Sequence, residues 1–245
     1  MHGGISVLRG AFRMANRRSP QSNNLLEALP FDELASLRAQ ATDVELVVNS
    51  TLHEAGGPVD HVYFPYGGLV SLLVVMPDGS VVEAGFVGSE GAVGTISTLP
   101  ARTSFTRSIV ITSGTALRLP FEQFERIMDQ SKTFRRLIAQ NNERIAERGQ
   151  QIAACNLLHQ LETRLCRWLL QVVDNSENPS IMITQDNLAQ MLGVNRARLN
   201  EALKSLQALD AIAQTQRGVL TIIDADLIAE RVCDCYPVLR FAKSN

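Results

Sequence analysis

The chain lacks any hydrophobic run long enough to cross a membrane. Its densest apolar run, Leu69–Met76, has eight residues, whereas a membrane-spanning helix needs about 20. The N-terminal segment also lacks the continuous apolar stretch that a secretory signal peptide requires. We therefore expect a cytoplasmic protein that has no membrane partner.

Cysteine is scarce, with 4 cysteines among 245 residues. So few cysteines over this length do not make a disulfide scaffold, and in a reducing cytosol we expect them to be thiols. Cys233 and Cys235 form a close pair, but one pair falls short of the four ligands of a structural zinc site. The sequence therefore predicts no metal site.

An excess of basic charge is missing as well. The net charge is −2 and the pI is about 6.1, whereas domains that bind nucleic acid are often basic. The hydrophobic share of 45% is too high for a disordered chain. Positive charge does gather in residues 1–23, which hold four arginines and no acidic residue, and which we interpret as a disordered basic arm.

Residues 24–129 consist of short β-branched runs separated by turns, one of them the hairpin signal Pro77-Asp78-Gly79. Short strands at regular spacing predict an antiparallel β-barrel or sandwich. Helical patterns follow the strands from about residue 121 onward. The expected fold class is therefore α+β, with an N-terminal barrel as a first domain.

Residues 130–158 predict one long helix. Ile138, Ile145 and Ile152 recur every seven residues, a spacing that is typical of a two-stranded coiled coil. The alternative is a helix that packs on its own barrel, which accounts less well for this spacing. We therefore predict a dimer seam made of Phe134, Ile138, Asn141, Ile145, Arg148, Ile152 and Cys155.

Residues 159–245 contain the pattern of a winged helix-turn-helix. Thr184 is a suitable N-cap for a first helix, Gln185 to Met191, and Gly193 ends that helix where a left-handed residue is needed. Asn195 then caps a second helix, and a hairpin that turns at Arg217-Gly218 supplies the wing. Such second helices enter the major groove of DNA.

The predicted DNA contacts lie on these elements. We interpret Arg196 as a reader of base edges, because arginine can grip guanine through two hydrogen bonds, and Arg198 as a contact to either a base or a phosphate. Over residues 195–207 the local charge is +2 in spite of the acidic total. The full set is Thr184, Gln185, Asn195, Arg196, Arg198, Asn200, Lys204 and Arg217.

Three longer segments resemble the CRP/FNR family of bacterial transcription regulators, and the resemblance extends from about residue 24 to 240. The segments are Val62–Ser71 and Val87–Gly94 in the barrel and Glu162–Leu170 before the helix-turn-helix. The resemblance implies a cyclic-nucleotide-binding-like double-stranded β-helix that senses an unknown signal, for which a small-molecule effector is one candidate. It also implies a homodimer that binds a two-fold symmetric site on double-stranded DNA and acts with RNA polymerase.

The resemblance places the effector pocket at Gly91, Ala92, Val93, Arg102, Thr103 and Ser104. Gly91-Ala92 stands where cyclic-nucleotide-binding members carry Gly-Glu for the ribose, so we expect no cyclic nucleotide. No cysteine precedes Cys155, which excludes the N-terminal iron–sulfur cluster of oxygen-sensing members. We interpret His53 and His61 as surface histidines rather than haem ligands, and predict no cofactor.

Two other classes of protein compete with a DNA-binding regulator. A metal-binding cupin enzyme needs a His-x-His pair, which the sequence lacks, so we do not expect an enzyme. A ligand-sensing module that acts only through protein contacts would have no use for Arg196 and Arg198 on the second helix.

Overall fold

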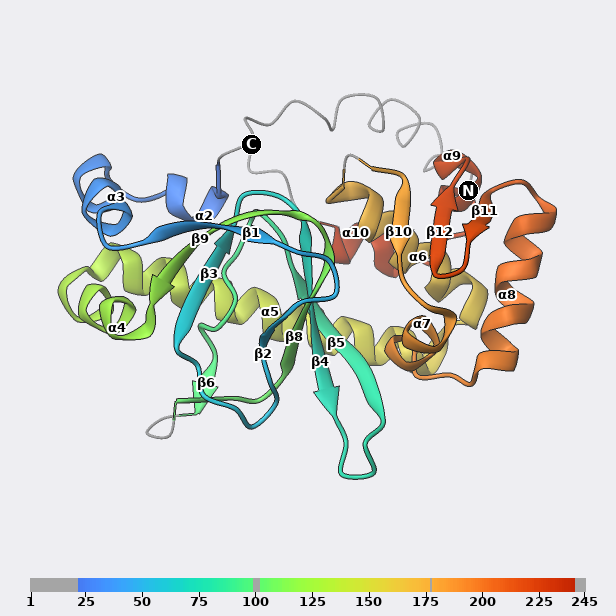
Figure 1. Ribbon diagram of the computed structural model, residues 1–245, viewed down its shortest axis with the longest axis horizontal. Helices are drawn as coiled ribbons and strands as arrows, with labels where there is room; N and C mark the ends of the chain where they lie inside the picture. Colours follow the sequence, from blue (N-terminus) through green and yellow to red (C-terminus); the bar gives the residue numbers. More distant parts are fainter. Residues whose placement is uncertain (1–21, 99–101, 177, 241–245) are drawn as a thin grey trace.

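The computed structural model describes residues 22–98, 102–176 and 178–240 (Figure 1). It has the expected α+β architecture, in which a barrel-like set of sheets is followed by a long helix and a winged helix-turn-helix. Residues 1–21 of the predicted arm lie outside the described residues. The last residue of that arm, Asn23, is instead buried, and its Nδ2 donates to the carbonyl oxygens of Pro65 and Gly91 at 2.8 Å each.

The N-terminal domain is built from three antiparallel sheets with the strand orders β2-β8-β4-β5, β1-β9-β3 and β6-β7. The predicted hairpin joins β4 to β5, and Gly79 takes the positive φ of 83° that its turn requires. The strands are β1 (Thr42–Leu46), β2 (Thr51–His53), β3 (His61–Pro65), β4 (Leu69–Val75), β5 (Val81–Val87), β6 (Ser97–Thr98), β7 (Thr103–Ser104), β8 (Arg107–Thr112) and β9 (Gly114–Pro120).

Aliphatic side chains fill the space between the two larger sheets. The buried cluster there is formed by Leu46, Val70, Leu72, Val87, Val93, Val110 and Ala116. A second cluster lies under the flanking helices, where Phe124 of α4 packs edge-on to Phe134. These helices are α2 (Asn24–Glu27), α3 (Phe31–Arg38) and α4 (Phe121–Gln130).

The long helix α5 (Lys132–Leu158) runs along the barrel and packs on β5 (Figure 1). Its N-cap is Ser131, whose hydroxyl accepts a hydrogen bond from the Phe134 amide at 2.9 Å. Gly149 permits the close approach to β5, because a Cβ at this position would lie 3.1 Å from the Ala84 carbonyl oxygen. The predicted helix is therefore present, with almost the predicted bounds.

The predicted dimer seam on this helix needs correction. The structure buries five of its seven residues against their own chain, namely Phe134, Ile138, Asn141, Ile152 and Cys155. Arg148 is also engaged within the chain, because its Nη1 lies 2.8 Å from Glu90 Oε1. Ile145 is half-buried against the barrel core. The seven-residue spacing thus marks the face of α5 that covers the barrel and the C-terminal domain, and the five buried residues are covered by their own chain.

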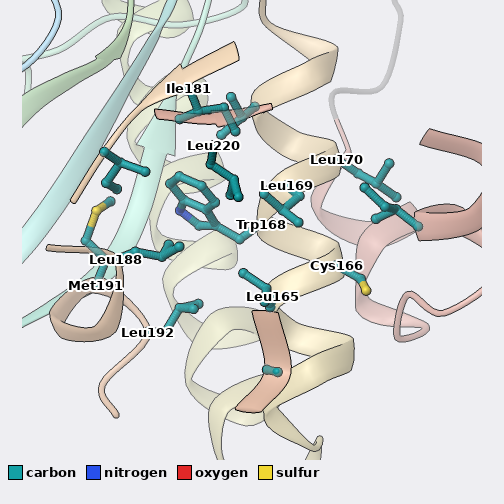
Figure 2. Packing of buried hydrophobic residues seen from close by; sticks show 14 of the residues in the cluster. Leu165, Cys166, Trp168, Leu169, Leu170, Ile181, Leu188, Met191, Leu192 and Leu220 are labelled. Atoms are coloured by element: carbon teal, nitrogen blue, oxygen red, sulfur yellow. The ribbon is translucent and has the colours of Figure 1, made fainter. Parts of the chain in front are cut away.

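The C-terminal domain consists of helices around a three-stranded wing sheet with the order β10-β12-β11. Figure 2 shows Trp168 of the first helix beside Leu188, Ile181 and Leu220, which come from the helix-turn-helix and the wing sheet. The elements are α6 (Leu161–Asp174), β10 (Ser180–Met182), α7 (Gln185–Met191), α8 (Arg196–Ala208), β11 (Ile212–Gln216), β12 (Val219–Ile222), α9 (Ala225–Ala229) and α10 (Cys235–Leu239).

The two domains share a continuous buried interface. Leu69 and Phe86 of the barrel belong to the same buried cluster as Trp168. Trp168 Nε1 donates to the buried carboxylate of Glu83 at 3.2 Å, and the Ser71 hydroxyl donates to the same oxygen. Within the described residues, no helix is both long and apolar enough to span a bilayer.

Candidate nucleic-acid interface

Local capping positions the two helices of the helix-turn-helix. Thr184 Oγ1 accepts from the Asn187 amide at 3.1 Å at the start of α7, and Asn195 Oδ1 accepts from the Arg198 amide at 2.9 Å at the start of α8. Gly193 lies between the helices with a φ of 65°, a left-handed conformation that costs glycine little. The structure confirms these three predicted elements of the motif.

The wing lies beside the start of α7. Strands β11 and β12 meet at Arg217-Gly218, where Gly218 has a φ of 80°. Gln185 Nε2 at the start of α7 donates to Gln214 Oε1 on the wing at 3.2 Å. Strand β11 of the wing thus contacts the N-terminus of α7. Figure 1 shows α8 and the wing at the end of the molecule opposite α3 and α4.

The exposed cations on this surface differ in their partners. Arg196 pairs with Asp186 of α7, with Nη1 and Oδ1 3.3 Å apart and both side chains more than 60% exposed. Arg198, Lys204 and Arg217 are exposed and make no ion pair with any residue that the structure describes. The acidic neighbour of Arg196 was not anticipated, since nothing in the sequence spacing indicates it.

Asn200 differs from the other predicted DNA contacts. It is half-buried, and its Oδ1 is enclosed without a hydrogen-bond partner among the described residues. Thr184 and Asn195 are exposed, but their side-chain oxygens already serve as caps. The cations therefore form the part of the surface that is most open to DNA.

Two protein-family models match the chain, in the order in which the structure places the corresponding domains. A model of the cyclic nucleotide-binding domain matches residues 43–131, and a model of the Crp-like helix-turn-helix domain matches residues 163–231. The chain belongs to the CRP/FNR family. This CRP/FNR protein is a DNA-binding transcription regulator, so the cupin-like enzyme is set aside.

Several solved structures share the fold of this chain. A protein from Eubacterium rectale assigned to the family aligns with a TM-score of 0.65 at 13% identity, over 84% of this chain and 96% of its own. FixK2 from Bradyrhizobium japonicum gives 0.62 at 11% identity, over 79% and 98%. A CRP-family regulator from Thermus thermophilus gives 0.63 at 18%, over 77% and 95%. A search of curated proteins found no match.

The residues predicted to form the effector pocket of this CRP/FNR protein do not line a described cavity together. Ala92 and Val93 are buried, and Asn141 of α5 accepts from the Ala92 amide at 3.0 Å and donates to its carbonyl oxygen at 3.2 Å. A Cβ at Gly91 would lie 2.6 Å from Asn141 Oδ1. The Asn141 side chain thus takes up both hydrogen-bonding groups of the Ala92 backbone.

The basic residue of the predicted pocket, Arg102, has its partners on α4. Arg102 forms an ion pair with Glu125 at 2.5 Å, and its guanidinium lies 5.4 Å from the centre of the Phe121 ring. The larger of the two described cavities, of about 770 Å³, lies instead among α2, α5 and α10, and none of the six predicted residues lines it.

The two histidines considered as haem ligands take part in the packing of the barrel. His53 is buried rather than on the surface, which corrects the prediction for this residue. Its Nε2 lies 2.8 Å from the His61 carbonyl oxygen, and its ring packs edge-on to Tyr63. Burial lowers the pKa of His53, as expected for an imidazole that is kept neutral.

One group of potential metal ligands escaped the sequence analysis. Cys233 and Cys235 were interpreted as an isolated pair, but the end of α5 brings Cys155 and His159 next to them. The two pairs are more than 70 residues apart along the chain, so no local motif links them.

Proposed function

We propose that two copies of this chain pair through α5 and read a two-fold symmetric DNA site with their two α8 helices. The exposed, unpaired cations at the N-terminal part of α8 and at the wing tip carry this proposal. In a symmetric dimer, the two helices would enter successive major grooves about 34 Å apart. Arg198 and Lys204 on α8 and Arg217 on the wing are then available to bases or phosphates without breaking an existing ion pair.

Arg196 has a different role in this proposal, because DNA must displace Asp186 from it. An exposed ion pair of this kind is worth about 0–1 kcal/mol, so the contact with DNA overcomes it easily. On DNA that lacks the preferred base, the Arg196 guanidinium would keep its ion pair with Asp186. The pair therefore supports Arg196 as a residue whose contact depends on base sequence.

The dimer in this proposal uses the face of α5 that the barrel leaves open. Ala139, Ala146 and Ala153 are exposed and recur every seven residues, with Glu143 and Gln150 between them. The same stripe ends at Leu157, which is 86% exposed. Alternating steps of three and four residues suit a coiled-coil seam, and alanines permit a close approach of the two helices.

We infer further that the barrel does not respond to a cyclic nucleotide. Ala92 supplies no carboxylate for a ribose, Asn141 holds the loop backbone, and Arg102 is paired with Glu125. An effector, if the protein requires one, belongs to another chemical class. In this proposal, the DNA-bound dimer acts on RNA polymerase in the cytoplasm.

Selection of DNA fragments from a random library by the purified protein tests this function. We expect enrichment of a sequence with two-fold symmetry. Replacing Arg198 by Ala should weaken binding, whereas Arg126→Ala removes the same charge from the exposed part of α4 and should leave binding unchanged. Equal affinity of the Arg198 variant and the wild type would contradict the assigned surface.

A further inference from the structure

The group of Cys155, His159, Cys233 and Cys235 is assembled from two distant parts of the chain. Cys155 and His159 lie one helical turn apart at the C-terminal end of α5, where His159 is the C-cap. Cys233 precedes α10, and Cys235 is the first residue of α10. One ligand atom from each of the four residues lies within 4.8 Å of all the others.

Two of the separations between these atoms match the edges of a tetrahedron around a single ion. With Zn–S bonds of about 2.3 Å and Zn–N bonds of about 2.0–2.1 Å, ideal tetrahedral angles give about 3.8 Å between two sulfurs and about 3.6 Å between sulfur and nitrogen. The structure has 3.6 Å between the Sγ atoms of Cys155 and Cys233. Between Cys235 Sγ and His159 Nδ1 it has 3.5 Å.

The surroundings of the group suit thiolates that are bound to a cation. Cys155, Cys233 and Cys235 are 0%, 6% and 4% exposed, and all three are free thiols. Gln151 Nε2, one turn before Cys155 on α5, donates to Cys235 Sγ at 3.0 Å. This contact resembles the outer hydrogen bonds that orient metal ligands.

Two arginines of α6, Arg164 and Arg167, are buried, and they bear on the net charge that a metal centre would have here. Three thiolates and one neutral imidazole around a divalent ion carry a net charge of −1. Arg167 is 1% exposed, and its Nη1 donates to Gln171 Oε1 at 2.8 Å. Arg164 is also buried, and its Nε, like that of Arg167, has no hydrogen-bond partner among the described residues. An anionic centre would give Arg164 a counter-charge, and would add to the one that Glu83 supplies to Arg167.

We propose that Cys155, His159, Cys233 and Cys235 bind one zinc ion in a closed, tetrahedral Cys₃His site. Such sites are structural, because the protein fills all four coordination positions. The ion would fasten the end of α5 to the C-terminal segment of the DNA-binding domain, directly beside the junction between α5 and α6. It would thereby fix the orientation of α8 relative to the dimer helix.

Cobalt is a direct probe of this geometry in the full-length protein. We expect the protein purified under reducing conditions to contain one zinc ion per chain by elemental analysis. After the zinc is removed with a chelator, titration with Co²⁺ should produce the intense visible bands of tetrahedral Co²⁺ with thiolate ligands, saturating at one ion per chain. Zinc should displace the cobalt and abolish the bands.

Single substitutions test whether these four residues are the metal ligands. Cys155→Ser and Cys233→Ser should each lose the zinc, and His159→Asn should weaken binding and shift the cobalt bands. Cys166→Ser is the matched control, because Cys166 is a buried thiol on α6 outside the group, and it should keep the full metal content. The cobalt titration of the wild type remains decisive where a cysteine variant fails to fold.

Four results would overturn the assignment. The first is a chelated wild type that binds neither Co²⁺ nor Zn²⁺, and the second is a Cys233→Ser protein that binds zinc as tightly as the wild type does. The remaining two are an iron–sulfur chromophore and a Cys155–Cys233 disulfide in protein isolated under reducing conditions. A failure of DNA binding would not bear on the site, since metal content and cobalt spectra are measured without DNA.

Discussion

Replacement of Asn141 by leucine separates the two interpretations of α5 most sharply. In the coiled-coil interpretation Asn141 is a polar interruption of an apolar seam, and leucine should strengthen the dimer. In the structure its side chain instead holds both the amide and the carbonyl oxygen of Ala92, at 3.0 and 3.2 Å. The substitution would leave two buried backbone groups without these partners.

The expected magnitude follows from those two groups. Leaving a buried polar group unpaired costs about 1–3 kcal/mol, and two such groups cost about 2–6 kcal/mol. Burial of the leucine side chain returns about 1.5–3 kcal/mol. We therefore expect Asn141→Leu to lower the free energy of unfolding by about 2 kcal/mol, the difference between the midpoints of the two ranges.

Urea denaturation followed by far-UV circular dichroism measures this loss as a lower midpoint with an unchanged slope. Gln140→Leu is the control, because Gln140 is exposed on the same helix and surface changes usually stay within about 0.5 kcal/mol. An Asn141→Leu protein that is more stable than the wild type would refute the role assigned to Asn141.

Three further predictions concern the dimer, the interface between the domains and the DNA contact. Ala146→Glu together with Ala153→Glu places like charges opposite each other along the proposed seam, and should give monomers in sedimentation velocity; a variant that stays dimeric would exclude this face of α5. Burial raises the pKa of Glu83 above its ordinary value of 4.5, while hydrogen bonds from Ser71 and Trp168 and the charge of Arg167 oppose the rise. The folded state therefore holds the proton more tightly than the unfolded state, so the contribution of Glu83 to stability is full below its unfolded pKa and is lost as the pH rises through its folded pKa. Thermal unfolding of Glu83→Gln, compared with the wild type from acidic to neutral pH, should lack this loss, and parallel pH profiles of the two proteins would contradict it. Arg196→Ala should cost about 1–3 kcal/mol of binding on the selected site and relax base preference at one position; equal weakening on all DNA sequences in a titration would make Arg196 a phosphate contact.

The helix-turn-helix could be predicted from the sequence because its signals are local. The caps Thr184 and Asn195 act on amides three residues away, and Gly193 and Gly218 mark positions with positive φ. Each signal lies within the element that it specifies. The structure therefore has these helices and the wing with the expected bounds.

The function of the α5 stripe could not be predicted in the same way. The isoleucines at intervals of seven residues show which face of the helix is apolar, but not what covers it. The barrel covers Ile138 and the shared core covers Ile152. Only the placement of the barrel leaves the alanine stripe exposed, and this is the face that we propose for the partner.

The Cys₃His group could not be predicted either, because it is assembled from residues that lie far apart in the sequence. Cys155 and Cys233 are separated by 78 positions, and their spacing matches no short metal-binding motif. The burial of His53 likewise depends on where the loop around Gly94 lies, since a Cβ at Gly94 would be 2.8 Å from the His53 ring. Composition around either residue gives no indication of these neighbours.

The most direct test of the central claim is nuclease footprinting on the selected DNA sequence, with the wild type and the Arg198→Ala protein side by side. The account predicts that the wild type protects two half-sites related by a two-fold axis and spaced about one helical turn apart. It also predicts that the Arg198 variant loses this protection while Arg126→Ala keeps it. Protection without two-fold symmetry, or a footprint that survives the loss of Arg198 unchanged, would contradict the account.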